Sequence, residues 1–120
     1  MRHPNVPDEL STALETVASA QGWVVAYDTH YDAANAEMSK WVGSNLHRLD
    51  FQPFPGKGIT VTHLIDKYFI LPRFCHWAER AVPLLPPLAK TEWKTLGELE
   101  FHQPPSSYLS KVAAYAQVAA

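Results

Sequence analysis

The segment from Leu46 to Ile65 constrains the fold most, because its pattern is that of a β-hairpin. Two alternating runs flank the loop Pro53-Phe54-Pro55-Gly56-Lys57-Gly58, which is too long for a two-residue turn and too rich in proline for a ladder. Each run has one apolar face that ends in a histidine. These faces consist of His47, Leu49 and Phe51 in the first strand and Ile59, Val61 and His63 in the second.

The segments around the hairpin are expected to add helices and further strands. A helix over residues 10–18 is expected to end at Gly22, followed by a largely buried strand over residues 23–27. A second helix is expected over residues 34–42 with Asp32 as its cap, and a third from Pro72 through residue 81. A short helix is expected through Trp93 and Leu96 to Gly97. The last expected helix is capped by Ser106 or Ser107, and its inward residues are Leu109, Val112, Ala113 and Ala116. An edge strand is expected over residues 98–102.

Together these elements predict the fold class. Most strands have only one consistently apolar face, whereas a parallel sheet covered on both sides would have continuous apolar strands. We therefore expect an α+β fold with an antiparallel sheet of about four strands and helices packed mainly on one face. A chain of 120 residues fits one small domain, residues 1–120.

The composition points to a partner that covers part of the surface. Apolar residues make up 47% of the chain and charged residues 18%, against about 25% charged in ordinary domains. The four tryptophans fit a shared core, and exposure of one or two of them would mark a binding cleft or a dimer face. We expect a homodimer, with another protein or a small apolar ligand as further partners.

Charge and cysteine content exclude other classes. The net charge of −2 and the scattered Lys and Arg residues argue against nucleic acid. The single cysteine, Cys75, excludes an internal disulfide and a cysteine zinc site. No apolar run resembles a signal peptide or approaches the roughly 20 residues of a membrane span, so no membrane association is expected. We expect a cytoplasmic location and no cofactor.

The two hairpin histidines are the first candidate site. If Phe51 pairs with Ile59, His47 faces His63 directly, with β-carbons about 4.5–5.5 Å apart. Two imidazoles at this distance could share a metal ion or transfer a proton near neutral pH. A register shifted by two residues would keep both on one face but separate them. The alternative is a structural role, with both rings bonded to backbone or water at the sheet end.

Two further groups are candidates for ligand binding. Asp28, His30 and Asp32 share one side if their segment is extended, although a helix cap and a polar strand end explain them equally. Asp66 follows His63 but lies on the opposite face of a continuing strand, and a role as the cap of a turn at Tyr68 is its alternative.

No stretch carries a functional motif at the spacing that identifies a family. We therefore expect a non-enzymatic binding or protein-interaction module that self-associates, with a small-ligand cleft at the sheet end. The alternative is a small metal-assisted or histidine acid–base enzyme that uses His47 and His63, supported by Asp28 or Asp66. An acidic antagonist that blocks a larger partner is a third reading.

Overall fold

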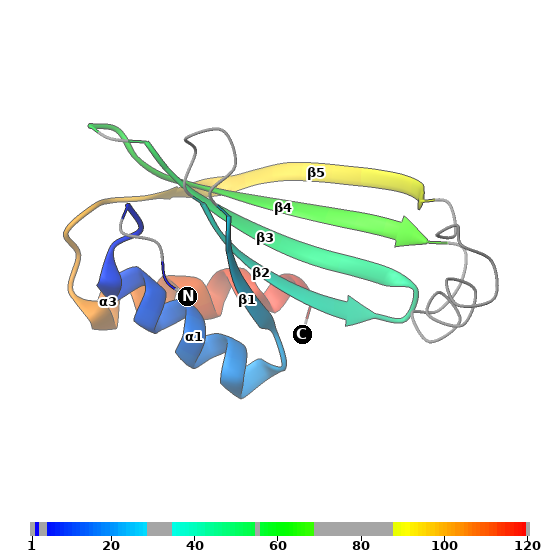
Figure 1. Ribbon diagram of the computed structural model, residues 1–120, viewed down its shortest axis with the longest axis horizontal. Helices are drawn as coiled ribbons and strands as arrows, with labels where there is room; N and C mark the ends of the chain where they lie inside the picture. Colours follow the sequence, from blue (N-terminus) through cyan, green and yellow to red (C-terminus); the bar gives the residue numbers. More distant parts are fainter. Residues whose placement is uncertain (1, 3–4, 29–34, 55, 69–87, 120) are drawn as a thin grey trace.

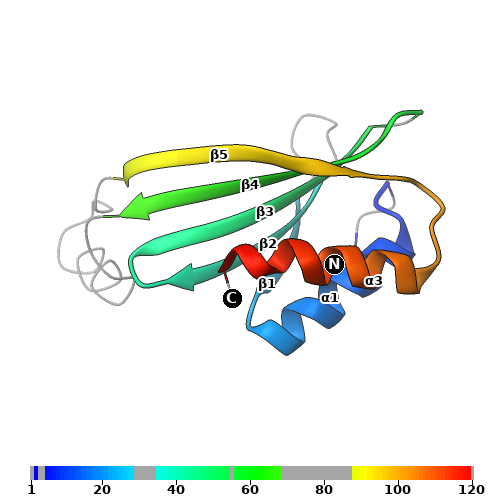
Figure 2. The same cartoon turned by 180° about the vertical axis from the view of Figure 1, so that it is seen from behind.

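In the described part of the chain, the fold is a five-stranded antiparallel sheet with two helices packed on one of its faces (Figures 1 and 2). The computed structural model describes residues 2, 5–28, 35–54, 56–68 and 88–119. The strands follow in the order β1-β2-β3-β4-β5, so every strand pairs with its neighbour in sequence. The expected α+β class and antiparallel sheet are confirmed, and the sheet has five strands instead of about four.

Helix α1 (Asp8–Gln21) and strand β1 (Val24–Asp28) form the N-terminal part as the sequence predicts. Leu10, Leu14 and Val17 lie on the buried side of α1, and Gly22 ends the helix. The expectation that the strand is largely buried is wrong, because Val24 is 66% exposed whereas Trp23 is buried. As the edge of the sheet, β1 has one face toward the helices and one toward solvent.

Strand β2 (Asn35–Val42) replaces the helix expected over residues 34–42. Ala36 and Met38 are fully buried and alternate with less buried residues, which is the period of a strand. The helical reading used Met38, Trp41 and Val42, but Trp41 and Val42 are both exposed. A tight turn joins β2 to the next strand, and Gly43 supplies its left-handed conformation with φ of 61°.

Strands β3 (Asn45–Phe54) and β4 (Gly58–Tyr68) form the predicted hairpin and extend into its expected loop, where Pro53 pairs with Ile59. The register differs by two residues from the expected one, in which Phe51 pairs with Ile59. Phe51 pairs with Val61 and Leu49 with His63, so His47 lies opposite Ile65. The shift arises because the turn is centred on Gly56, one residue later than the expected register requires. Phe54 pairs with Gly58, and Lys57 donates its N–H to the Phe54 carbonyl.

Strand β5 (Leu88–Leu99) occupies the segment where a short helix and a separate edge strand were expected. Thr91, Trp93 and Thr95 alternate with Glu92 and Lys94, and threonine and tryptophan favour strands. Gly97, expected to stop the helix, pairs with Val61 inside the strand. The edge strand expected over residues 98–102 is therefore wrong beyond Leu99, because β5 ends there.

Helix α3 (Pro105–Tyr115) continues into the short 3-10 helix η2 (Ala116–Ala119) and packs against α1. Its expected serine caps are wrong, because Pro104 is the N-cap residue and no side chain caps the helix. Tyr108 and Val112 are buried, whereas Leu109 is 39% exposed. The buried face therefore lies about one residue around the helix from the expected one.

The core fills the space between the two helices and one face of the sheet. Its largest fully buried side chains include Leu10, Leu14, Met38, Leu49, Phe51, Ile59, Val61, Leu99, Tyr108 and Val112. No helix in the described ranges has the length and apolar character needed to cross a membrane. The helix expected from Pro72 and the cap expected at Asp32 lie outside the described residues.

Candidate functional site

The rings of His47 and His63 are joined directly by a hydrogen bond. Nδ1 of His47 lies 3.0 Å from Nε2 of His63, and the ring planes differ by 16°. The centroids are 5.2 Å apart, which exceeds the separation of the nitrogens by about the sum of the two ring radii. The imidazoles therefore meet edge to edge in nearly one plane, which is the geometry of a straight N–H···N bond.

The two histidines meet across a diagonal of the β3–β4 ladder. His63 pairs with Leu49 and His47 pairs with Ile65, so their backbones are not directly opposed. Diagonal neighbours on one face lie about 7–8 Å apart, within reach of two imidazoles that extend toward each other. The expectation that a shift of two residues would separate the rings is therefore wrong, although the shared face is as predicted.

The pair lies where the helices stop covering the sheet. Leu49 is fully buried, whereas His47 and His63 on the same face are half-buried. The strands continue past the helices toward the turn between β2 and β3 (Figures 1 and 2). The two rings therefore have one side against the core and another toward solvent.

Burial lowers the pKa of both histidines. For His47 the larger cause is desolvation and the smaller is the positive charge of Lys40, which lies directly opposite it on β2. For His63 the causes are desolvation and then the nearby His47. Both effects favour the neutral rings, and a neutral pair keeps the hydrogen bond because one ring donates while the other accepts.

Lysines flank the pair on both neighbouring strands. Lys40 lies opposite His47, with its Nζ 5.9 Å from the centroid of the Trp23 ring. Lys94 on β5 lies opposite His63 and is exposed. Lys40 is not among the site residues expected from the sequence, because its segment was expected to be helical. The alternation of Ala36, Met38 and Lys40 was the signal for its position on this face.

Asp66 belongs to the face of the sheet that points away from α1 and α3, and not to the histidine pair. It lies within β4, so the expected cap of a turn at Tyr68 is wrong. One oxygen of Asp66 lies 2.8 Å from Nε of Arg48, and the other accepts a hydrogen bond of 2.9 Å from the Thr91 hydroxyl. Its side chain is only 9% exposed. These contacts hold three strands together and assign Asp66 a structural role.

The remaining predicted residues are not brought to the pair. Asp28 ends β1 and pairs with Asn35, at an edge strand that two further strands separate from β4. His30 lies outside the described residues. Within the described ranges, no three histidine, cysteine, aspartate or glutamate side chains are grouped as a metal site requires.

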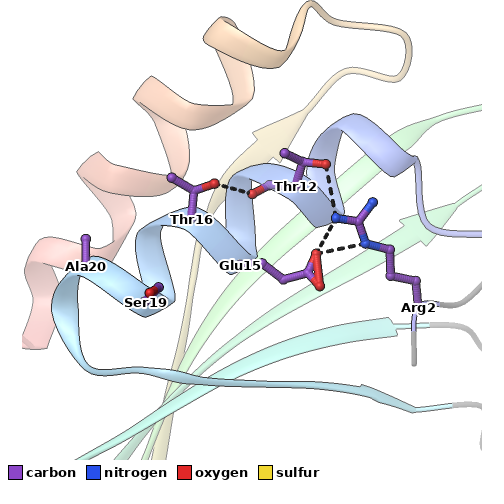
Figure 3. A pocket seen from close by; sticks show the side chains of 6 residues that line it. All are labelled: Arg2, Thr12, Glu15, Thr16, Ser19 and Ala20. Atoms are coloured by element: carbon purple, nitrogen blue, oxygen red, sulfur yellow. Dashed lines mark hydrogen bonds and ion pairs between the residues drawn. The ribbon is translucent and has the colours of Figure 1, made fainter.

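Two surface hollows lie elsewhere. The first, an open hollow of about 600 Å³, follows α1, where Glu15 and Thr12 already bind the guanidinium of Arg2 (Figure 3). The second, of about 210 Å³, lies at the β3–β4 loop and includes Lys57 and Glu98 in its lining. Neither is lined by His47 or His63, so neither is the ligand cleft expected at the histidines.

Two of the described tryptophans have exposed side chains. Trp23 lies in the core, whereas Trp41 and Trp93 are 41% and 70% exposed, on the face of the sheet away from α1 and α3.

Comparison with models of known protein families, with curated proteins and with solved structures gave no match. The function is therefore inferred from the geometry of the histidine pair and its surroundings.

Proposed function

We propose that this chain is a non-enzymatic binding module whose ligand is a small anion, such as a carboxylate or sulfate group, held beside His47 and His63. The observation that carries the proposal is the direct hydrogen bond between the two rings. We propose an anion in place of the apolar ligand considered from the sequence, because Lys40 lies directly opposite His47 on β2 and the two rings can donate hydrogen bonds.

The hydrogen bond fixes what the outer nitrogens offer to a ligand. In a neutral pair, the ring that accepts the bond carries its proton on its outer nitrogen, and the donating ring has a bare outer nitrogen. One added proton leaves the N–H···N bond intact and turns both outer nitrogens into donors. Because the rings meet edge to edge, the two outer N–H groups point away from each other, so an anion would accept a hydrogen bond from one of them and be attracted by the positive charge that the pair shares.

The surrounding charge favours an anion over a metal ion. Lys40 faces His47 and already lowers its pKa, so its charge would repel a bound divalent cation in the same way. An anion would be attracted by Lys40 and would stabilise the protonated pair. Anion binding is therefore coupled to proton uptake, and the affinity is expected to rise as the pH falls toward the pKa of the pair.

The test is a titration of the whole chain with sodium sulfate, which carries the same charge over the range of histidine ionisation. The NMR signals of His47 and His63 are expected to shift together and saturably, and sulfate is expected to raise the pKa of the pair. A titration at constant ionic strength that leaves both signals unchanged would rule out the anion site.

Substitutions separate a site from general charge screening. His63→Gln removes the second imidazole and Lys40→Gln removes the facing charge, and each is expected to weaken sulfate binding by about tenfold. The matched control is Lys57→Gln, which removes a lysine from the turn before β4 and should leave binding unchanged. Equal losses in all three variants would contradict the proposal.

The metal-assisted enzyme considered from the sequence gives the opposite result in the same assay. Zinc is expected to bind more weakly than sulfate because a two-histidine site beside a lysine is short of ligands and carries the wrong charge. Saturable zinc binding at the pair with no effect of sulfate would overturn the anion proposal and favour the enzyme.

A further inference from the structure

We infer that two copies of this chain associate through strand β5, so that their sheets join across a two-fold axis at Trp93. This goes beyond the anion site and does not depend on it, because the contact uses the outer edge of the sheet. The occupant of this edge is a second copy of the same chain.

Strand β5 is a long edge strand. In the described part of the chain it pairs with β4 on one side and with no strand on the other. Such an edge presents a row of main-chain N–H and C=O groups that can pair with another strand. The regular stretch runs from Lys90 to Thr95, because the pairing with β4 is irregular at Tyr68 and again between Val61 and Thr62.

The residues of this stretch are complementary to themselves in an antiparallel pair. Their order is Thr91-Glu92-Trp93-Lys94-Thr95. The residues next to Trp93 on its two sides have opposite charges, and the residues after those are both threonines. A two-fold axis at Trp93 places Glu92 of each copy opposite Lys94 of the other, so two ion pairs form. The same axis opposes Thr91 and Thr95, and threonine pairs favour adjacent strands.

The charges disfavour the neighbouring registers. Those considered place the helices of both copies on the same side of the joined sheet. An axis at Glu92 would oppose two glutamates, and an axis at Lys94 would oppose two lysines. An axis at Thr91 would place Lys90 opposite Glu92, but Lys94 would then have no acidic partner across the axis. The register at Trp93 is therefore the one that uses both Glu92 and Lys94.

Trp93 adds apolar surface at the axis. It is 70% exposed in the single chain and lies on the face of the sheet away from α1 and α3, opposite Leu64 of β4. On the axis it meets the Trp93 of the second copy, and tryptophan is among the residues most enriched at interface centres. One strand pair buries less area than a standard interface, so we expect a reversible dimer with Kd of about 1–100 μM.

Charge exchange tests this arrangement by sedimentation of the full chain in a buffer without sulfate. Glu92→Lys and Lys94→Glu each place like charges across the axis, and each is expected to weaken the dimer by at least about tenfold. Mixing the two variants restores opposite charges on both sides, so they are expected to form a heterodimer. The double variant E92K/K94E is expected to dimerise as the natural chain does.

Matched controls carry the same charge changes outside the paired stretch. Glu98→Lys changes a residue of β5 beyond the irregular pairing, and Lys57→Glu changes the turn before β4. Both are expected to leave the dimer unchanged. Because Glu92 also forms ion pairs with Lys67 and Lys90, the thermal midpoint of Glu92→Lys is measured first, and Glu92→Gln replaces it if the fold is lost.

Three results would overturn the inference. They are a natural chain that stays monomeric at about 500 μM, a Kd that neither single charge change alters, and a mixture of the two variants that does not associate. If each single variant dimerises more weakly but their mixture does not associate, the axis does not lie at Trp93. All of these results come from association in a buffer without sulfate, so the dimer and the anion site can fail separately.

Discussion

The hydroxyl of Tyr115 lies 2.7 Å from the position that a β-carbon on Gly97 would occupy. Tyr115 is at the end of α3 and Gly97 lies in β5, so this contact joins the C-terminal helix to the edge of the sheet. The glycine leaves room for the tyrosine ring above the strand. Close approach, not a turn, therefore explains a glycine inside a strand that pairs with Val61.

A methyl group at position 97 is expected to push against the Tyr115 hydroxyl. Gly97→Ala should lower the free energy of unfolding by about 1–2 kcal/mol, measured by urea denaturation. The double variant Gly97→Ala, Tyr115→Phe removes the clashing oxygen and should regain most of the loss. A double variant no more stable than Gly97→Ala would show that the contact is not the cause.

The buried carboxylate of Asp66 predicts a second stability effect. Asp66→Ala leaves the guanidinium of Arg48 and the hydroxyl of Thr91 without this partner, so we expect a loss of about 2–4 kcal/mol in urea denaturation. The control is Glu15→Ala, which breaks the exposed ion pair with Arg2 and should cost less than about 1 kcal/mol. Equal costs would contradict the structural role of Asp66.

The histidine pair predicts how stability depends on pH. Burial holds the pKa of His47 and His63 below the value of 6.5 expected in the unfolded chain. As the pH falls through 6.5, the unfolded chain takes up these protons first, so the free energy of unfolding decreases until the folded pKa values are passed. Urea midpoints across this range should fall less steeply in the double variant His47→Gln, His63→Gln. Identical slopes would show that the pair is not responsible.

A hydrogen bond of the Tyr108 hydroxyl links the first half of α3 to the segment after β5. It donates a hydrogen bond of 2.6 Å to the carbonyl of Glu100, and the ring is fully buried. Tyr108→Phe keeps the ring but leaves that carbonyl without this donor, so the free energy of unfolding measured by urea denaturation is expected to fall by about 1 kcal/mol. Tyr108→Leu, which also opens a cavity, should cost clearly more. A larger loss from Tyr108→Phe than from Tyr108→Leu would be inconsistent with this packing.

Local patterns predicted the elements whose exposed and buried sides are clear in sequence. The stripe of Leu10, Leu14 and Val17 identified α1, and the alternation around Leu49 identified the hairpin. The sequence favours helices over residues 34–42 and through Trp93 and Leu96 to Gly97, because short runs with tryptophan fit both periods, but both segments lie in strands. Pairing with neighbouring strands decided both, and such pairing depends on residues distant in the chain.

The sequence by itself determined that His47 and His63 share a face of one hairpin, because the two-residue period of a strand requires it. Only the tertiary structure decided that their rings meet, since the register depends on the tight connection between Phe54 and Gly58 and the diagonal contact depends on side-chain reach. The same holds for Asp66, whose face followed from alternation while its partner Arg48 came from the adjacent strand. Periodicity is a local property of the chain, whereas register and contact arise when separate strands pack together.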